Sequence, residues 1–175
     1  MPLTTYTAGE VLTATSLNNN FTFAASSGRI AQIVNSTYSA VATGTTTIPR
    51  DDTIPQNTEG DQYMSQAITP TSATNILVVQ AVFFGGSSAN GDLTGALFID
   101  STANAVAACM EYVVANENVM LVLTYTEVAG GTAAKTFKFR VGNSAAGTTT
   151  FNGRASVRLF GAITKSSMII TEYTP

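Results

Sequence analysis

Residues 48–63, IPRDDTIPQNTEGDQY, gather charged side chains in a chain that otherwise has few. The carboxylates of this segment are Asp51, Asp52, Glu59 and Asp61. Calcium ions bind several carboxylate oxygens, but the spacing of these four does not match an EF-hand loop. A glycosidase needs two facing carboxyl groups, whereas the adjacent side chains of Asp51 and Asp52 point apart on an extended backbone. We therefore expect an ordered connection in which these groups bond the backbone, with a cation site as the alternative.

Catalytic chemistry is further limited by the residues that the chain lacks. It contains no histidine and one cysteine, Cys109. Ser-His-Asp and Cys-His catalytic groups, and zinc sites that include histidine, all need the missing residue. In AVAACMEYVV, residues 105–114, no side chain is suited to activate the thiol, so Cys109 is predicted to be a small buried apolar residue. We expect a protein that is not an enzyme and that holds no cofactor.

The overall composition excludes several classes of partner. Only 11% of the 175 residues are charged, compared with roughly 25% in typical soluble domains. The formal net charge is -3, and no basic patch predicts nucleic-acid binding. No apolar run is long enough to span a membrane, and the N-terminus does not have the pattern of a signal peptide. A surface with so little charge favours close packing against other chains, because few charges must be desolvated.

The elements that position these side chains are predicted to be strands from residue 30 onward. In KTFKFRV, residues 135–141, apolar and charged residues alternate, which is typical of a strand with one wet face. RASVRLFGAI, residues 154–163, alternates in the same way, and FNGR, residues 151–154, predicts a type I′ hairpin through its Asn-Gly pair. We expect an all-β fold, an antiparallel β-sandwich or jelly-roll-like domain of roughly eight or nine strands over residues 29–175.

One predicted strand is apolar on both of its faces. It is TNILVVQAVFF, residues 74–84. One face holds Leu77, Val79, Ala81 and Phe83, and the other holds Ile76, Val78, Val82 and Phe84. A sandwich core covers only one face of each strand, so the second face requires a second layer or a neighbouring subunit. The sequence therefore predicts a subunit interface at the second set of four residues.

Residues 1–28 differ from the rest of the chain. Leu12, Leu17 and Phe21 fall near helical spacing, but a helix of about three turns is marginal alone in water. Asn18–Asn20 are poor helix formers. We expect a short helical or extended segment that becomes ordered when its apolar residues enter a groove on a partner or pack around a symmetry axis.

Three stretches of the sequence resemble structural proteins of tailed-bacteriophage virions. YTAGEVLTATSLNNNF, residues 6–21, is similar to the opening of many such proteins. Residues 47–78 and 151–173 resemble the first half and the last strands of a β-domain found in phage fibre and spike proteins. The resemblance implies a homotrimer that is located on the virion. Its N-terminal segment would bind capsid or tail proteins through Leu12, Leu17 and Phe21, and its β-domain would project outward.

Phage fibres usually have a long shaft between anchor and tip, and this chain departs from that pattern. The first predicted strand begins within about ten residues of Phe21. A short spike or fibre tip fits this spacing, and so does the alternative, a decoration (cement) protein that stabilises the capsid. A third alternative is a polysaccharide-degrading enzyme, which needs two positioned carboxylates.

The distal loops of such a protein are candidates for contact with a host-surface glycan or protein. They are predicted at residues 85–92, 128–134 and 142–147. Tyr112 and Tyr125 are the side chains that could stack on a sugar, but both lie in strand-like runs. We therefore expect both tyrosines to pack in the core.

Overall fold

Twelve strands and one α-helix make up most of the described chain. The computed structural model describes residues 5–11, 13–26 and 28–175. The helix is α1 (Ala14–Ser26). The strands are β1 (Ile30–Tyr38), β2 (Ala42–Gly44), β3 (Asp61–Ile68), β4 (Ile76–Ser87), β5 (Gly91–Ile99), β6 (Ala107–Val113), β7 (Asn118–Val128), β8 (Lys135–Asn143), β9 (Thr149–Phe151), β10 (Gly153–Arg154), β11 (Val157–Arg158) and β12 (Ser166–Tyr173).

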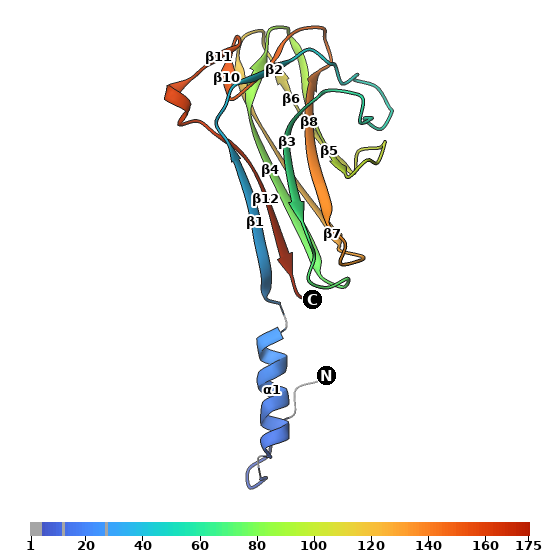
Figure 1. Ribbon diagram of the computed structural model, residues 1–175, viewed down its shortest axis with the longest axis vertical. Helices are drawn as coiled ribbons and strands as arrows, with labels where there is room; N and C mark the ends of the chain where they lie inside the picture. Colours follow the sequence, from blue (N-terminus) through green and yellow to red (C-terminus); the bar gives the residue numbers. More distant parts are fainter. Residues whose placement is uncertain (1–4, 12, 27) are drawn as a thin grey trace.

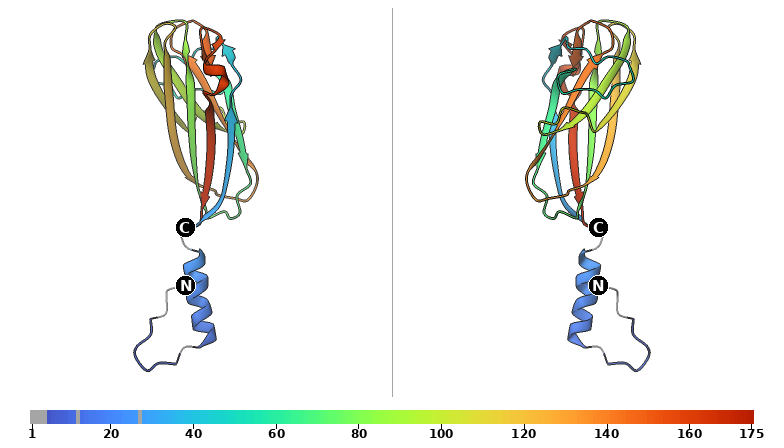
Figure 2. Two further views of the ribbon diagram at one scale, coloured as in Figure 1. Left: turned by 90° about the vertical axis from the view of Figure 1, so that its left-hand side faces the viewer. Right: turned by 90° about the vertical axis from the view of Figure 1, so that its right-hand side faces the viewer.

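The strands form two antiparallel sheets that face each other, as Figures 1 and 2 show. In one sheet β12 and then β9 pair with the same edge of β4, and β7 pairs with its other edge. β1 and β2 lie outside β12 and β9 in turn. The main strand order is therefore β1-β12-β4-β7 in this sheet and β3-β8-β5-β6 in the other. The four main strands of the first sheet and the four strands of the second follow the order of a jelly roll, which confirms the predicted fold class.

The core between the two sheets is apolar and rich in aromatic rings. In β8, Phe137, Phe139 and Val141 are fully buried, as the alternation in the sequence predicted. Near the end of β4, where Phe151 pairs with Gly85, the rings of Tyr63 and Phe151 stack with their centroids 5.2 Å apart. Burying these large side chains is the main favourable contribution to folding, at roughly 25 cal/mol per Å² of apolar surface.

The predicted strand at residues 154–163 is wrong, and so is the predicted Asn-Gly hairpin. The chain turns at Ala155 and Ser156, which have φ angles of 48° and 63°, and this turn joins β10 to β11. Residues 160–162 then form a single 3-10 turn. Alternating residues had suggested an extended strand, but a local hairpin with two positive φ angles interrupts it.

Asn152 takes a different role from the one expected of a turn residue. Its side chain is buried, and its amide nitrogen donates to the carbonyl oxygens of Tyr38 and Ala40 at 3.0 and 3.1 Å. Its amide oxygen accepts a hydrogen bond of 2.8 Å from the Ser166 hydroxyl. This amide therefore ties the link between β1 and β2 to the start of β12, because every one of its bonds crosses to another segment.

Glu172, near the end of β12, holds the opposite end of the same sheet together. Its buried carboxylate accepts hydrogen bonds from Gln32 Nε2 at 2.5 Å, Asn75 Nδ2 at 2.6 Å and both the amide and the hydroxyl of Thr71 at 2.8 Å. Burial alone raises the pKa of a carboxyl group, but these hydrogen bonds outweigh it and lower the pKa of Glu172 to about 2. The carboxylate therefore joins β1, β12 and the β3–β4 connection in its charged form.

Helix α1 lies beyond the end of the sandwich at which β12 finishes (Figure 1). Thr13 caps it, because the Thr13 hydroxyl oxygen accepts a 3.2 Å hydrogen bond from the Ser16 amide. Asn18–Asn20 lie inside the helix rather than at its end. Among the described residues, no helix combines the length and the apolar character that crossing a membrane requires.

Candidate subunit interface and attachment segment

The outer face of the sheet β1-β12-β4-β7 carries no charged side chain. Its outward positions alternate with buried core positions along each strand. We call the following set the uncharged face: Ile33, Asn35, Thr37, Ile76, Val78, Gln80, Val82, Phe84, Met120, Val122, Thr124, Thr126, Val128, Ser167, Ile169, Thr171 and Tyr173.

The structure places all four predicted interface residues on the uncharged face. Ile76, Val78, Val82 and Phe84 point outward from β4 and are half-buried by their neighbours in the sheet. Ile76 is flanked by Tyr173 and Val128, and Val82 by Ser167 and Val122. Phe84 pairs with Met120. The four residues thus form the middle of an apolar surface that continues onto the adjacent strands.

The side chains on β7 expose the most apolar surface of this face. Met120, Val122 and Val128 are 60%, 58% and 60% exposed, and Ile33 on β1 is 57% exposed. Single exposed apolar residues are ordinary, but contiguous apolar patches on a protein mark a surface for binding. This arrangement suits burial against another protein without any charge to desolvate.

The outer face of the other sheet is charged, and a segment of the chain covers it. Ile48, in the connection from β2 to β3, is 1% exposed and packs on Ala96 and Phe98 of β5. Arg140 of β8 donates from Nε to the Glu59 carbonyl oxygen at 2.8 Å. The chain therefore completes this side of the sandwich itself, with an apolar contact and a charge-assisted hydrogen bond.

Two of the four candidate metal-ligating carboxylates bond to their own segment, residues 48–63. Asp51 accepts from the Thr53 amide at 2.9 Å, and Glu59 accepts from the Gln56 amide at 2.9 Å. The hydrogen bonds from the side chain and the backbone of Thr53 lower the pKa of Asp51.

Asp61 and Asp52 complete this set of carboxylates. Asp61 accepts from the Thr46 amide at 2.9 Å, and Asp52 lines a shallow depression of about 350 Å³ beside Ala105. Within residues 5–11, 13–26 and 28–175, no three His, Cys, Asp or Glu side chains gather as metal ligands would. The geometry is that of an ordered connection.

Two of the three predicted attachment residues, Leu17 and Phe21, belong to α1, which lies away from both sheets (Figure 2). Phe21 is 65% exposed and Leu17 is 39% exposed. Leu12 lies outside the described residues. A helix of this length gains little stability from an apolar face that stays in water, so burial of that face against another protein would supply most of the stability of the helix.

The loop predictions divide between the two ends of the sandwich. Residues 88–90 and 144–148 lie at the end away from α1, where β4 finishes and β9 begins. Residues 129–134 join β7 to β8 at the end near α1, so the prediction of a distal loop there is wrong. The antiparallel order of the strands fixes this division, because successive connections alternate between the ends.

The two tyrosines and the cysteine have different environments. Tyr112 on β6 is 58% exposed, so its predicted place in the core is wrong. Tyr125 packs against the core, and its hydroxyl donates to Glu127 Oε2 at 3.2 Å. Cys109 also packs against the core, and burial raises the pKa of its thiol, as expected for a structural cysteine.

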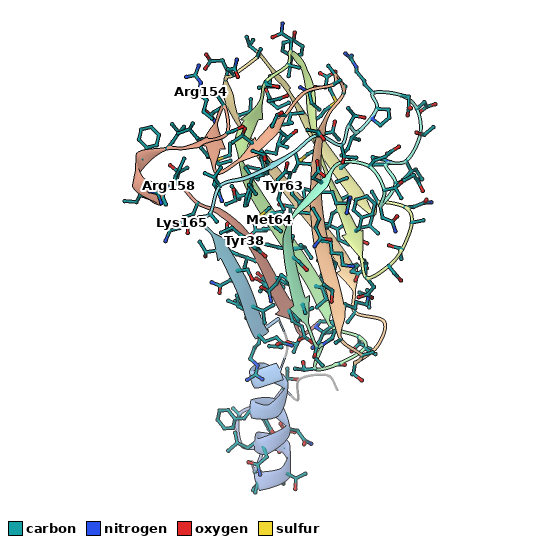
Figure 3. All side chains as sticks on the ribbon, turned by 45° about the horizontal axis from the view of Figure 1, so that its top comes forward. Tyr38, Tyr63, Met64, Arg154, Arg158 and Lys165 are labelled. Carbon is teal, nitrogen blue, oxygen red and sulfur yellow. The ribbon has the colours of Figure 1, made fainter. Side chains whose placement is uncertain are left out.

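The sequence reasoning missed one exposed segment that follows β10. Val157, Phe160 and Ile163 are 63%, 74% and 79% exposed. Figure 3 shows Arg158 and Lys165 on the same side of the sandwich. The available signal was Gly161, because a glycine inside an apparent strand marks a bend or a break.

Comparisons with known proteins give structural similarities of low extent. No protein-family model matches the chain, and no curated protein matches it in sequence. The chain is similar to a solved structure described as CBM4, with a TM-score of 0.41, 15% identity, and coverage of 73% of this chain and 76% of the other.

Two further solved structures come from viruses. The structure of infectious bursal disease virus, Gx strain, has a TM-score of 0.39 and 11% identity, covering 82% of this chain and 36% of the other. The enzymatically active domain of bacteriophage CBA120 tailspike protein 4 has a TM-score of 0.28 and 17% identity, covering 71% of this chain and 19% of the other. This chain thus spans about a third and about a fifth of those two chains.

Proposed function

We propose that this chain is a non-enzymatic structural protein of a tailed-bacteriophage virion. It forms a short homotrimeric fibre or spike, attached to the particle by its N-terminal segment and projecting the β-domain outward. The uncharged face is the observation that carries this proposal. The sequence resemblance of residues 6–21, 47–78 and 151–173 to phage fibre and spike proteins supports it and supplies the number of subunits.

Self-association follows from the physical character of the uncharged face. Ile76, Val78, Val82 and Phe84 present apolar surface in the middle of a broad sheet. Each Å² of apolar surface removed from water contributes roughly 25 cal/mol. The polar residues of this face are threonine, serine, asparagine, glutamine and tyrosine, which lose less hydration on burial than charged groups do. Identical subunits associate most often with closed symmetry.

Attachment to the particle is the role of α1. Leu17 and Phe21 stand on a helix that lies apart from the sandwich. A short amphipathic helix binds well in an apolar groove, where its ordering is repaid by burial of such side chains. The receiving groove would belong to a capsid or tail protein of the virion.

The spacing between α1 and the sandwich favours a second candidate function. α1 ends at Ser26 and β1 begins at Ile30, which leaves no room for a shaft between them. A decoration protein that stabilises the capsid needs no shaft. Imaging of particles that carry labelled protein separates the two, because a decoration protein covers the head in many copies and a fibre occupies a vertex or the tail in few.

Contact with the host surface belongs to the end of the sandwich away from α1. Residues 88–90 and 144–148 lie there, and their serine, asparagine and glycine residues suit hydrogen bonding to a glycan or protein. Binding to a glycan array tests this role. Incubation with host polysaccharide is expected to leave its viscosity unchanged, and a loss of viscosity would favour the enzyme alternative.

The test of the proposed assembly uses one substitution on each sheet. Val82→Lys places a charge in the middle of the uncharged face, and Gln62→Lys places the same charge at an exposed position of β3 on the other sheet. Analytical ultracentrifugation is expected to show a trimer for the wild type and for Gln62→Lys, and dissociated subunits for Val82→Lys, because a charge is costly to bury. A wild type that sediments as a monomer at all concentrations would overturn the proposal.

Attachment has a matched pair of variants on α1. Phe21→Asp removes an exposed apolar side chain, whereas Thr15→Asp adds the same charge at another exposed position of the helix. We expect Phe21→Asp to lose binding to particles that lack the protein and Thr15→Asp to retain most of it. Equal binding by the two variants would show that Phe21 does not serve attachment.

A further inference from the structure

Residues 155–165 form a prong beside the uncharged face. The segment follows β10 and ends where β12 begins, and it stands away from the sandwich in Figure 1. Val157, Phe160 and Ile163 are exposed on it. Phe160 has a φ angle of 48°, a conformation that an aromatic residue adopts only under constraint from its surroundings. The chain thus holds three large apolar side chains in water instead of burying them in its own core.

The charges of the prong have one sign. Arg158 and Lys165 are its cations, and residues 155–165 contain no acidic residue. The ion pairs among the described residues join Arg50 to Asp92, Lys135 to Glu127 and Arg154 to Glu117. Arg158 and Lys165 therefore remain outside these pairs and face solvent.

A surface of complementary composition lies along the other lateral edge of the uncharged face, across the sheet from the prong. β7 ends one sheet and β6 ends the other, and the two strands are in contact. We call residues 108–122, which include parts of both strands, the β6–β7 edge. Met110, Tyr112 and Val114 are 53%, 58% and 55% exposed there.

The β6–β7 edge is acidic where the prong is basic. Residues 108–122 contain Glu111 and Glu117 and no lysine or arginine. Glu111 is exposed and lies outside the ion pairs of the described residues. Complementary charges across an apolar contact set the orientation and the choice of partner.

The strand register places the prong and this edge at one level along the sandwich. The prong leads directly into Ser166 and Ser167 of β12. Ser167 pairs with Val82 of β4, and Val82 pairs with Val122 of β7. If copies are arranged around an axis parallel to the strands, the prong of one copy therefore lies at the same height as Met120 and Val122 of the next copy.

We propose that the prong packs against the β6–β7 edge of a second copy of this chain. Phe160 and Ile163 cover Met120 and Val122 of that edge, and Arg158 and Lys165 face Glu111. The contact joins two different surfaces, so it is heterologous and repeats around a ring, with the uncharged faces turned inward. This inference rests on the proposed self-association and names the surfaces that make it.

Cross-linking between differently tagged copies tests the proposed contact. In a Cys109→Ala background, Phe160→Cys chains are mixed with Met120→Cys chains and treated with a short bis-maleimide. Dimers that contain both tags are expected. Gln62→Cys, on the other sheet, replaces Met120→Cys in the matched control and is expected to give few. Equal yields from the two mixtures would overturn the proposal.

Charge reversal gives an independent measurement. Arg158→Glu with Lys165→Glu is expected to weaken association at least ten-fold, and adding Glu111→Lys is expected to recover much of the loss. All three positions are exposed, so the subunit fold is preserved. Unchanged association in the double variant would overturn the role of the prong.

The outcomes separate the failure of this inference from the failure of the proposed function. The prong contact is contradicted, and the virion role stands, if the wild type is a trimer that Val82→Lys dissociates, the two cross-linking mixtures give equal yields, and charge reversal leaves association unchanged. A monomeric wild type contradicts both.

Discussion

The two sheets of this jelly roll treat their outward apolar side chains in different ways. On β5, Ala96 and Phe98 point away from the core and are buried under Ile48 from the β2–β3 connection. On β4, Val82 and Phe84 point away from the core and stay partly exposed. The first sheet is completed by its own chain, and the second presents the same kind of surface to solvent. Apolar residues on the outward face of a strand therefore indicate that something packs on them. In this protein the β2–β3 connection packs on the outward residues of β5, whereas no described segment of the chain buries those of β4.

The largest expected effect comes from removing matched phenylalanines from the two outer faces. Phe98→Ala empties a site that is 1% exposed, and the expected loss is about 3–5 kcal/mol in the free energy of unfolding. Phe84→Ala is expected to cost clearly less, because its half-buried ring keeps contact with water. Urea unfolding of dilute, dissociated protein measures both. Equal losses would break the comparison between the covered and the uncovered sheet.

A second substitution tests how closely the β2–β3 connection packs on its sheet. A Cβ at Gly142 would lie 2.7 Å from the carbonyl oxygen of Thr46 and 2.8 Å from the amide nitrogen of Ile48. Gly142→Ala is expected to cost about 3 kcal/mol, the upper end for overpacking, because backbone atoms must move. Gly131→Ala serves as control, since a Cβ there meets nothing within 4 Å. If Gly142→Ala lowers the thermal midpoint of unfolding no more than Gly131→Ala does, the β2–β3 connection packs only loosely on its sheet.

A pH titration examines the uncovered sheet, which Glu172 joins to the β3–β4 connection. The pKa of this carboxyl falls from its ordinary value of 4.5 to about 2 in the folded protein. A lowered pKa means that its contribution to stability is present above pH 4.5 and is lost as the pH falls toward 2. We expect a loss on the order of 2 kcal/mol over this range.

Glu172→Gln is the control for this titration. An amide does not ionise, so the variant is expected to be less stable at neutral pH and to have a flatter pH profile. Unfolding curves measured at successive pH values provide the comparison. A variant whose profile has the same slope as the wild type would assign the acid sensitivity to another group.

The smallest expected effect concerns the ion pair on the covered sheet. Arg50 Nη1 lies 3.0 Å from Asp92 Oδ2, and the arginine side chain is 71% exposed. Arg50→Ala is therefore expected to cost no more than about 1 kcal/mol. Most of that difference should vanish when salt is raised from about 0.05 to 1 M, because the exposed charge is screened. A loss that persists in high salt would indicate that the arginine contributes through packing.

The hydrophobic periodicity of the sequence predicted those strands in which alternate residues are buried in the core and the residues between them face outward. The alternation of Phe137 and Phe139 with Lys138 and Arg140 in β8 matches a strand with one buried face. The two apolar faces of β4 were also readable from sequence, since each residue type reports directly on burial.

Periodicity failed where backbone conformation, not hydrophobicity, decides. Residues 154–163 alternate like a strand, yet positive φ angles at Ala155 and Ser156 make a hairpin. Neither residue is of a type that favours such angles, so no local signal was present. Glu172 was equally hidden, because its partners come from β1 and from the β3–β4 connection and are assembled only by the fold.

The place of β12 in its sheet sets an order on synthesis. β12 lies between β1 and β4, although Gln32 and Glu172, which bond across this junction, are 140 residues apart. While the chain emerges from the ribosome, β1 and β4 thus wait with unpaired edges until β12 is made. Such edges are prone to pair with other chains, and contacts this distant in sequence form slowly. The sheet that carries the uncharged face is therefore the last part of the domain to close, and the proposed assembly surface is complete only after β12 has been made.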